Sequence, residues 1–186
     1  MRWKQWLIVL LFPFSWLMPA NGLHSEYIWD TAFRNLEKFG QQLAKKNQLV
    51  YLNRGLGILV DNRDVALAIS LMGRQKLTIE ETRPLIVGMV QEFINLMKSD
   101  PTFEAYMQET HKHTSWYDPV MSPKRIGIKV SFWDANVDRY PPPYVSQVKV
   151  KEGKIFYYQT KSDSQFLDQP FSETFEEAFA LVRSSK

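Results

Sequence analysis

The segment of residues 77–101, LTIEETRPLIVGMVQEFINLMKSDP, constrains the fold more than any other part of the chain. Thr78 and Glu81 have the spacing of a capping box, in which each side chain accepts a hydrogen bond from the other residue's backbone N–H at a helix start. Pro84 follows early enough to be tolerated near the first turn. An apolar stripe then recurs at helical spacing: Leu85, Ile86, Met89, Val90, Phe93, Ile94 and Met97. A stripe this wide predicts a long helix that packs against a sheet.

Several other segments alternate apolar and polar residues with the period of two that is typical of β-strands. A β-hairpin is predicted at 56–72, with DNRD as its turn and a further extended piece at 49–52. The composition of ALAISLM offers a helix over 64–72 as the alternative, but the alternation favours a strand. Further strands are predicted at 126–132, 144–150 and 155–160. The last two are joined by KEGK, in which Gly153 can adopt a positive φ.

Three more helices complete the pattern. An amphipathic helix is predicted from Ser25 to the sequence KKNQ, and a short one begins at Pro101. Thr174 and Glu177 repeat the capping-box spacing before a closing helix. Strands joined by short turns favour antiparallel pairing, and the helices between them can cover only one face. The sequence therefore predicts a single α+β domain, a mostly antiparallel sheet of about four to six strands with helices packed on one face.

The first 22 residues have the three parts of a secretory signal peptide, namely a basic start, an apolar stretch and small residues at the exit. These parts are Arg2 and Lys4, residues 6–18, and Ala20 with Gly22. A retained membrane anchor is the alternative, but the apolar stretch is shorter than the roughly 20 residues that span a bilayer. We therefore predict cleavage of residues 1–22, a mature domain of residues 23–186, and a periplasmic or secreted location. The chain has no cysteine, so it has neither disulfides nor the lipid anchor of a cysteine-modified lipoprotein.

The charge of the chain does not indicate a nucleic-acid partner. The formal net charge is +3 and the sequence pI is about 9.0, but Arg2 and Lys4 belong to the predicted signal peptide. Without them the chain has 21 basic and 20 acidic residues. Nucleic-acid binding needs a clustered basic face, and the basic runs AKKNQ and SPKRIG are short. No nucleic-acid partner is predicted.

His111 and His113 form an H-x-H pair within THKHTSWYDP, residues 110–119. On an extended chain, residues two apart lie on the same face, so this pair could begin a zinc or copper site. A complete site needs three or four ligands, and no recognised spacing supplies the others. The alternative is a solvated loop whose Trp116 and Tyr117 pack against the core.

Asp134, Asn136 and Asp138 alternate as they do at the start of a calcium-binding loop. The match then fails, because Arg139 stands where such a loop needs glycine and Val145 where it needs glutamate. These residues are interpreted as a turn between strands.

Aromatic side chains gather in and beside the loops 110–122 and 134–144, where they could form an exposed patch for a partner. Pro141–Pro143 stand within the second loop, and proline cannot donate to a β-ladder. The prolines are therefore expected to fix the entry of the next strand. The predicted binding residues are Trp116, Tyr117, Asp134, Tyr140 and Tyr144.

Signatures of catalysis are weak in this sequence. It has no cysteine nucleophile, no G-x-S-x-G elbow and no glycine-rich phosphate loop. We therefore predict an exported, non-enzymatic domain of the cell envelope or exterior that binds a protein or small ligand, with no catalytic residue and no cofactor. The alternatives are an exported hydrolase-like enzyme or metal-binding protein that uses the loop of His111 and His113, and a membrane-tethered domain with an uncleaved start. The sequence does not indicate an oligomeric state.

Overall fold

The computed structural model describes residues 20–59, 64–113, 122–161 and 167–185. In this part of the chain, six strands form one sheet in the order of the sequence. They are β1 (Val50–Leu59), β2 (Asp64–Gly73), β3 (Ile126–Phe132), β4 (Gln147–Lys151), β5 (Lys154–Thr160) and β6 (Leu167–Thr174). Neighbouring strands are antiparallel except β2 and β3, which run parallel. The predicted α+β class with a mostly antiparallel sheet is confirmed.

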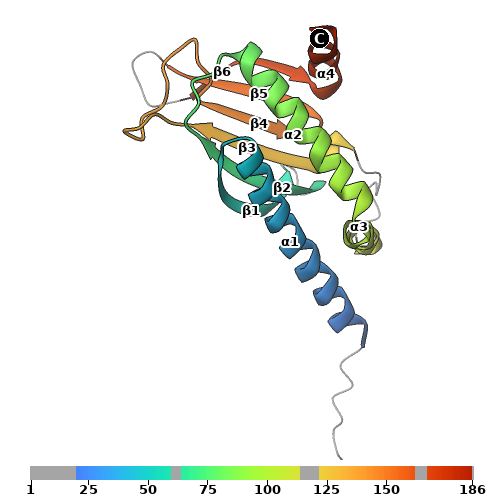
Figure 1. Ribbon diagram of the computed structural model, residues 1–186. Coiled ribbons are helices and arrows are strands. Elements are labelled where there is room, and N and C mark those ends of the chain that lie inside the picture. The colour runs from blue at the N-terminus through green and yellow to red at the C-terminus, as the bar shows by residue number, and fades with distance from the viewer. Residues whose placement is uncertain (1–19, 60–63, 114–121, 162–166, 186) are drawn as a thin grey trace, which may run out of the picture.

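The helices lie on one side of this sheet (Figure 1). They are α1 (Ala20–Lys46), α2 (Ile79–Ser99), α3 (Pro101–His113) and α4 (Phe175–Ser184), with a short 3-10 helix, η1 (Pro123–Arg125). Helices α1 and α2 cross the sheet, α3 packs against both of them, and α4 packs against α2 and β6. Helices α2 and α3 form the long connection that the parallel pairing of β2 and β3 requires. None of the described helices is long and apolar enough to cross a membrane.

Both predicted capping boxes are present. The backbone N–H of Thr78 donates to the Glu81 carboxylate at 2.9 Å, and the N–H of Glu81 donates to the Thr78 hydroxyl at 3.4 Å. At the start of α4 the corresponding distances between Thr174 and Glu177 are 2.8 and 3.2 Å. These reciprocal bonds satisfy donors that a helix start leaves without an intrahelical partner, so both helix starts follow from local sequence.

The core fills the space between the helices and one face of the sheet. Alternate side chains of the central strands point to the helices and are buried: Leu67, Ile69, Leu71, Ile128, Val130, Val148, Val150, Ile155 and Tyr157. Phe93 of α2 is fully buried among them and packs on Phe39 of α1, with ring centroids 5.1 Å apart. This alternation assigns the intervening residues to the opposite face of the sheet.

The structure differs from the sequence prediction most clearly at α3 and β6. Residues 108–113, expected in a connecting loop, continue α3, whose Phe103, Tyr106 and Met107 are buried at helical spacing. Strand β6 was not predicted at all. The hairpin is confirmed as β1 and β2, its first strand includes the extended piece at 49–52 from Val50 on, and 64–72 is a strand rather than a helix.

The prolines precede β4, as expected for the entry of a strand. After them, the Val145 N–H donates to the Leu77 carbonyl at 2.8 Å and the Ser146 N–H donates to the Tyr158 carbonyl at 2.9 Å. The regular pairing of β4 therefore begins only after the segment that cannot donate. The proposed signal peptide lies almost entirely in residues 1–19, outside the described residues, and residues 20–22 begin α1.

Candidate binding groove

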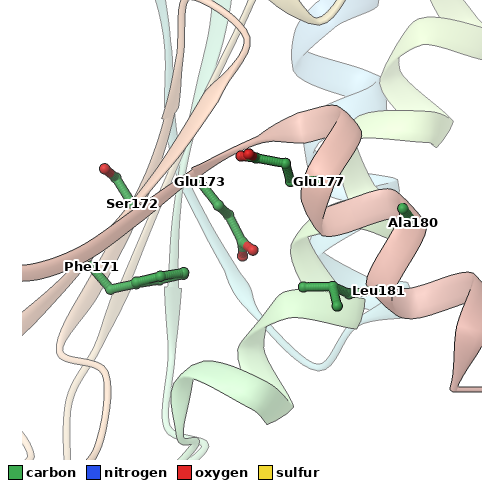
Figure 2. A pocket seen from close by; sticks show the side chains of 6 residues that line it. All are labelled: Phe171, Ser172, Glu173, Glu177, Ala180 and Leu181. Carbon is green, nitrogen blue, oxygen red and sulfur yellow. The ribbon is translucent and has the colours of Figure 1, made fainter.

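Two hollows, of about 490 and 380 Å³, adjoin α4, and Leu181 lines both of them. The first lies where β6 turns into α4 (Figure 2). The first is lined by Phe171, Ser172, Glu173, Glu177, Ala180 and Leu181. The second is lined by Glu80, Arg83, Pro84, Leu181, Val182 and Ser185. We call the two hollows together the α4 groove.

The alternation of β6 places the strand side of the groove. Phe171 and Glu173 point to the helix side, whereas Ser172 points away (Figure 2). Phe171 stands opposite Tyr157 of β5, with ring centroids 5.8 Å apart. Helix α4 starts immediately after the Thr174 cap and is held by buried Phe175 and Ala178. The corner between strand and helix therefore fixes where the two walls stand.

Apolar surface is exposed on both walls of the groove. Phe171 of β6 is 39% exposed and Leu181 of α4 is 48% exposed. Their side chains point into the same hollow (Figure 2). Single exposed apolar residues are common on protein surfaces, but apolar side chains gathered in one concavity are typical of an interaction site.

Glu173 forms a buried polar cluster beneath this surface. Its carboxylate accepts hydrogen bonds from Arg83 Nε at 2.8 and 3.1 Å and from the Tyr157 hydroxyl at 2.7 Å. Burial, and then the hydrogen bond and charge of Glu173, raise the pKa of Tyr157 far above its usual value. Partial burial alone would lower the pKa of Arg83, but the hydrogen bond and charge of Glu173 outweigh it and raise that pKa. The Tyr157 hydroxyl therefore stays protonated and neutral, and the opposite charges of Arg83 and Glu173 compensate each other.

Glu177 is also engaged within the chain. It accepts hydrogen bonds from the N–H and the hydroxyl of Thr174, both at 2.8 Å, and these bonds lower the pKa of its carboxyl group. A general acid or base needs a group that can exchange a proton with a substrate. The two carboxylates that line the first hollow are committed to Arg83, Tyr157 and the helix cap instead, so the groove is better suited to binding than to acid–base catalysis.

The outer edge of β6 offers few hydrogen-bond donors. The Phe175 N–H donates to the Gly153 carbonyl, so alternation directs the backbone groups of Ser172 and Thr174 away from β5. The Thr174 N–H is already bonded to Glu177, and Pro170 has no N–H. An edge of this kind resists the addition of another strand. Contacts at the groove are therefore expected to be made by side chains.

The structure does not combine the predicted site residues into one described site. Trp116 and Tyr117 lie outside the described residues. His111 and His113 stand in the last turn of α3, so their backbone is helical rather than extended. Among the described residues no group of three or more potential ligands gathers for a metal ion. The metal site at His111 and His113 stays a prediction.

Asp134 forms the turn that was expected for it. Its Oδ1 accepts hydrogen bonds from the backbone N–H groups of Asn136 and Asp138, at 2.8 and 2.9 Å. Its carbonyl accepts a hydrogen bond from Arg74 at 3.1 Å. These bonds give Asp134 a structural role in closing the loop.

Tyr140 and Tyr144 pack the same loop against the segment that precedes α2. The Tyr140 hydroxyl donates to the Arg74 carbonyl at 2.7 Å, and the Lys76 ammonium lies 4.2 Å from the centre of the Tyr144 ring. This loop lies at the opposite end of the strands from the α4 groove (Figure 1). The described part of the predicted binding surface and the α4 groove are therefore separate places.

Sequence reasoning missed the α4 groove because its two apolar walls have no common signal in the chain. Phe171 stands in the polar segment LDQPFSET, and Leu181 lies beside, not on, the apolar stripe of Phe175, Phe179 and Val182. The one sequence signal for the groove was Leu181, an apolar residue that lies off the apolar stripe of the closing helix.

Comparisons with known protein families, with curated proteins and with solved structures gave no match. The function of this chain is therefore inferred from its own residues and their geometry.

Proposed function

We propose that this chain is an exported, non-enzymatic binding domain whose α4 groove receives apolar side chains of a protein partner. The observation that carries the proposal is the pair of exposed apolar residues, Phe171 and Leu181, on facing walls of one groove. The charges of Arg83 and Glu173 beneath them are satisfied within the chain. An uncharged, apolar partner surface fits such walls better than an ion does.

The openness of the groove favours a protein over a small ligand. Small-molecule sites usually enclose most of the surface of their ligand, whereas Phe171 and Leu181 each keep a large exposed fraction. Covering an apolar side chain yields about 25 cal/mol per Å² removed from water. A few such anchors, surrounded by weaker contacts, supply most of the binding energy in protein interfaces. We therefore expect a partner that inserts one or two apolar side chains between β6 and α4.

Export is supported by the basic start, the apolar stretch of residues 6–18 and the small residues after it. N-terminal sequencing of the protein recovered from the periplasm or medium tests this part of the proposal. A chain that starts at about residue 23 is expected. An intact Met1 would instead favour the tethered alternative.

Peptide selection tests the groove. Peptides selected from a random library against the folded protein should be enriched in apolar side chains. The substitution Leu181→Asp should lower the affinity for a selected peptide about tenfold or more, because it places a charge in an apolar contact. Leu52→Asp is the matched control, because Leu52 is 51% exposed on β1, at the far edge of the sheet. Equal weakening by both substitutions would argue against the groove.

The hydrolase-like and metal-binding alternatives depend on His111 and His113. Their test is the metal content of the purified wild-type protein and of the double variant His111→Ala/His113→Ala. A stoichiometric metal ion that is lost in the variant would support the alternative. Equal metal content in the two proteins would remove it.

A further inference from the structure

The sheet face that points away from the helices carries four lysines on three neighbouring strands. Val148 and Val150 of β4 are buried against the helices, so Lys149 and Lys151, which alternate with them, lie on the other face. Lys149 stands directly opposite Lys129 of β3, and Lys151 stands directly opposite Lys154 of β5. Residues directly opposite in antiparallel strands share a face. We call Lys129, Lys149, Lys151 and Lys154 the lysine patch.

The lysine patch contains two like-charged cross-strand pairs, an arrangement that destabilises a sheet. Lys151 is partly compensated by an ion pair with Glu152 at 3.2 Å. Lys154 lies near enough to Glu177 for its charge to help lower the pKa of that carboxyl group. Lys129 and Lys149 form no ion pair within the part of the chain that the structure describes. Among the described residues, Lys129 and Lys149 thus form a repulsive pair at the centre of the sheet without an ion-pair partner.

Lys149 shows the effect of burial and of the neighbouring positive charges. Partial burial, followed by the positive charges of Lys129 and Lys151, lowers the pKa of its ammonium group. The ammonium lies 4.9 Å from the centre of the Tyr158 ring, whose face is electron-rich. An anion bound between the lysines would reverse the unfavourable charge interactions, so the patch is favourable to a negatively charged ligand.

We propose that the lysine patch binds a small molecule that carries two or more phosphate groups. Neighbouring strands are about 4.8 Å apart and residues two apart in a strand are about 6.6 Å apart, so the four lysines stand at the corners of a compact quadrilateral. One small polyanion can reach all four ammonium groups. Lysine binds phosphate as a mobile point charge. The planar guanidinium group of arginine instead favours bidentate hydrogen bonding to carboxylates.

The surroundings of the patch favour a small ligand over a long polyanion. On one side of Lys129 stands Ser70 of the neighbouring strand β2. Along β3 and β4, the next cross-strand pair is Ser131 with Gln147. These neighbours are uncharged, so the positive surface ends on these sides and does not continue as a stripe. A long nucleic acid would gain from a continuous basic track. The patch includes none of the residues that line the α4 groove, so this inference does not depend on the proposed function.

Calorimetric titration of the full-length chain with sodium tripolyphosphate tests the proposal at low ionic strength, where screening is weak. We expect saturable binding by the wild type and a loss of about tenfold or more in affinity for Lys129→Gln/Lys149→Gln. Lys45→Gln/Lys98→Gln is the control, since it removes the same charge from two exposed positions at the ends of α1 and α2. Equal losses in the two variants, or no binding by the wild type, would overturn the proposal.

Thermal unfolding separates lost binding from lost folding. Without ligand, Lys129→Gln/Lys149→Gln should unfold at the same temperature as the wild type or higher, because a repulsive pair has been removed. Tripolyphosphate should raise the unfolding temperature of the wild type and leave the variant unchanged. A variant that unfolds at a lower temperature without ligand and still responds to tripolyphosphate would contradict the assignment.

Vesicles distinguish a soluble ligand from a membrane surface. Binding of the wild type and of the double variant is measured on phosphatidylcholine vesicles with and without phosphatidic acid. Both proteins contain the apolar N-terminal stretch, so it cannot account for a difference between them. Binding that depends on phosphatidic acid and on the lysines, without any binding of tripolyphosphate, would overturn the proposal in favour of a lipid surface. Tripolyphosphate binding that is lost in the variant supports it.

Discussion

Glu173 holds a negative charge at a position where its side chain is only 4% exposed, and Arg83, 15% exposed, is its partner. Replacing Arg83 by methionine would leave the carboxylate buried without its ion-pair partner, and breaking a buried pair in this way costs about 3–5 kcal/mol of unfolding free energy. Urea denaturation measures the loss. The double variant Arg83→Met/Glu173→Met should recover part of it, because no unpaired charge remains, although the Tyr157 hydroxyl loses its acceptor.

Arg34 provides the matched control for Arg83. It pairs with Asp30 on the surface of α1 at 2.9 Å, where both side chains are more than half exposed. Exposed pairs contribute about 0–1 kcal/mol, so Arg34→Met should change the stability little. If Arg83→Met costs no more than Arg34→Met, Glu173 is not a buried charge that depends on its partner.

Tyr157 makes the domain sensitive to alkaline pH. Its pKa is raised in the folded state by burial and by Glu173, whereas an unfolded tyrosine has a pKa of about 10. Above pH of about 10 the unfolded chain loses a proton that the folded chain retains, so stability falls as the pH rises. Tyr157→Phe removes this contribution, and urea denaturation at pH 8 and pH 11 should show the wild type losing more stability than the variant. Equal losses would contradict the raised pKa.

At the scale of the elements, two helical glycines should respond in opposite ways to the same substitution. A Cβ at Gly40 of α1 would collide with the Tyr51 ring, which packs there from β1, whereas a Cβ at Gly88 of α2 would meet nothing within 4 Å. Alanine is more favourable than glycine in a helix by about 0.8–1.0 kcal/mol, so Gly88→Ala should stabilise the protein. Gly40→Ala should destabilise it by about 1–3 kcal/mol through overpacking. Thermal denaturation measures both changes, and stabilisation by both would mean that Tyr51 does not pack closely on α1.

Elements with local signals were predictable from the sequence. The capping boxes of α2 and α4 depend on residues three positions apart, and β3 shows its alternation in its own seven residues. Strand β6 lacks such a signal, because residues 168–172 are exposed and include a proline. Its strand conformation comes from pairing with β5. The extension of α3 through QETHKH was missed for a similar reason, since polar residues show no apolar period.

At the scale of the whole molecule, both candidate sites depend on relations that the sequence does not display. The α4 groove exists only because α4 turns back beside β6 and brings Leu181 next to Phe171. The lysine patch exists only because of the strand register, which brings Lys129 opposite Lys149, twenty positions away in the chain. A nearly balanced total charge therefore concealed a local concentration of positive charge on one face of the sheet.

We propose that the α4 groove, rather than the loop of residues 134–144, is the surface that receives a protein partner. NMR titration with a selected peptide tests this proposal. The changes in the backbone amide chemical shifts show which residues of the protein contact the peptide. We predict that the largest changes fall on residues 171–173 of β6 and 177–182 of α4, and that Leu181→Asp abolishes them. Changes concentrated on Asp134, Tyr140 and Tyr144, with β6 and α4 unaffected, would contradict this assignment of the binding surface.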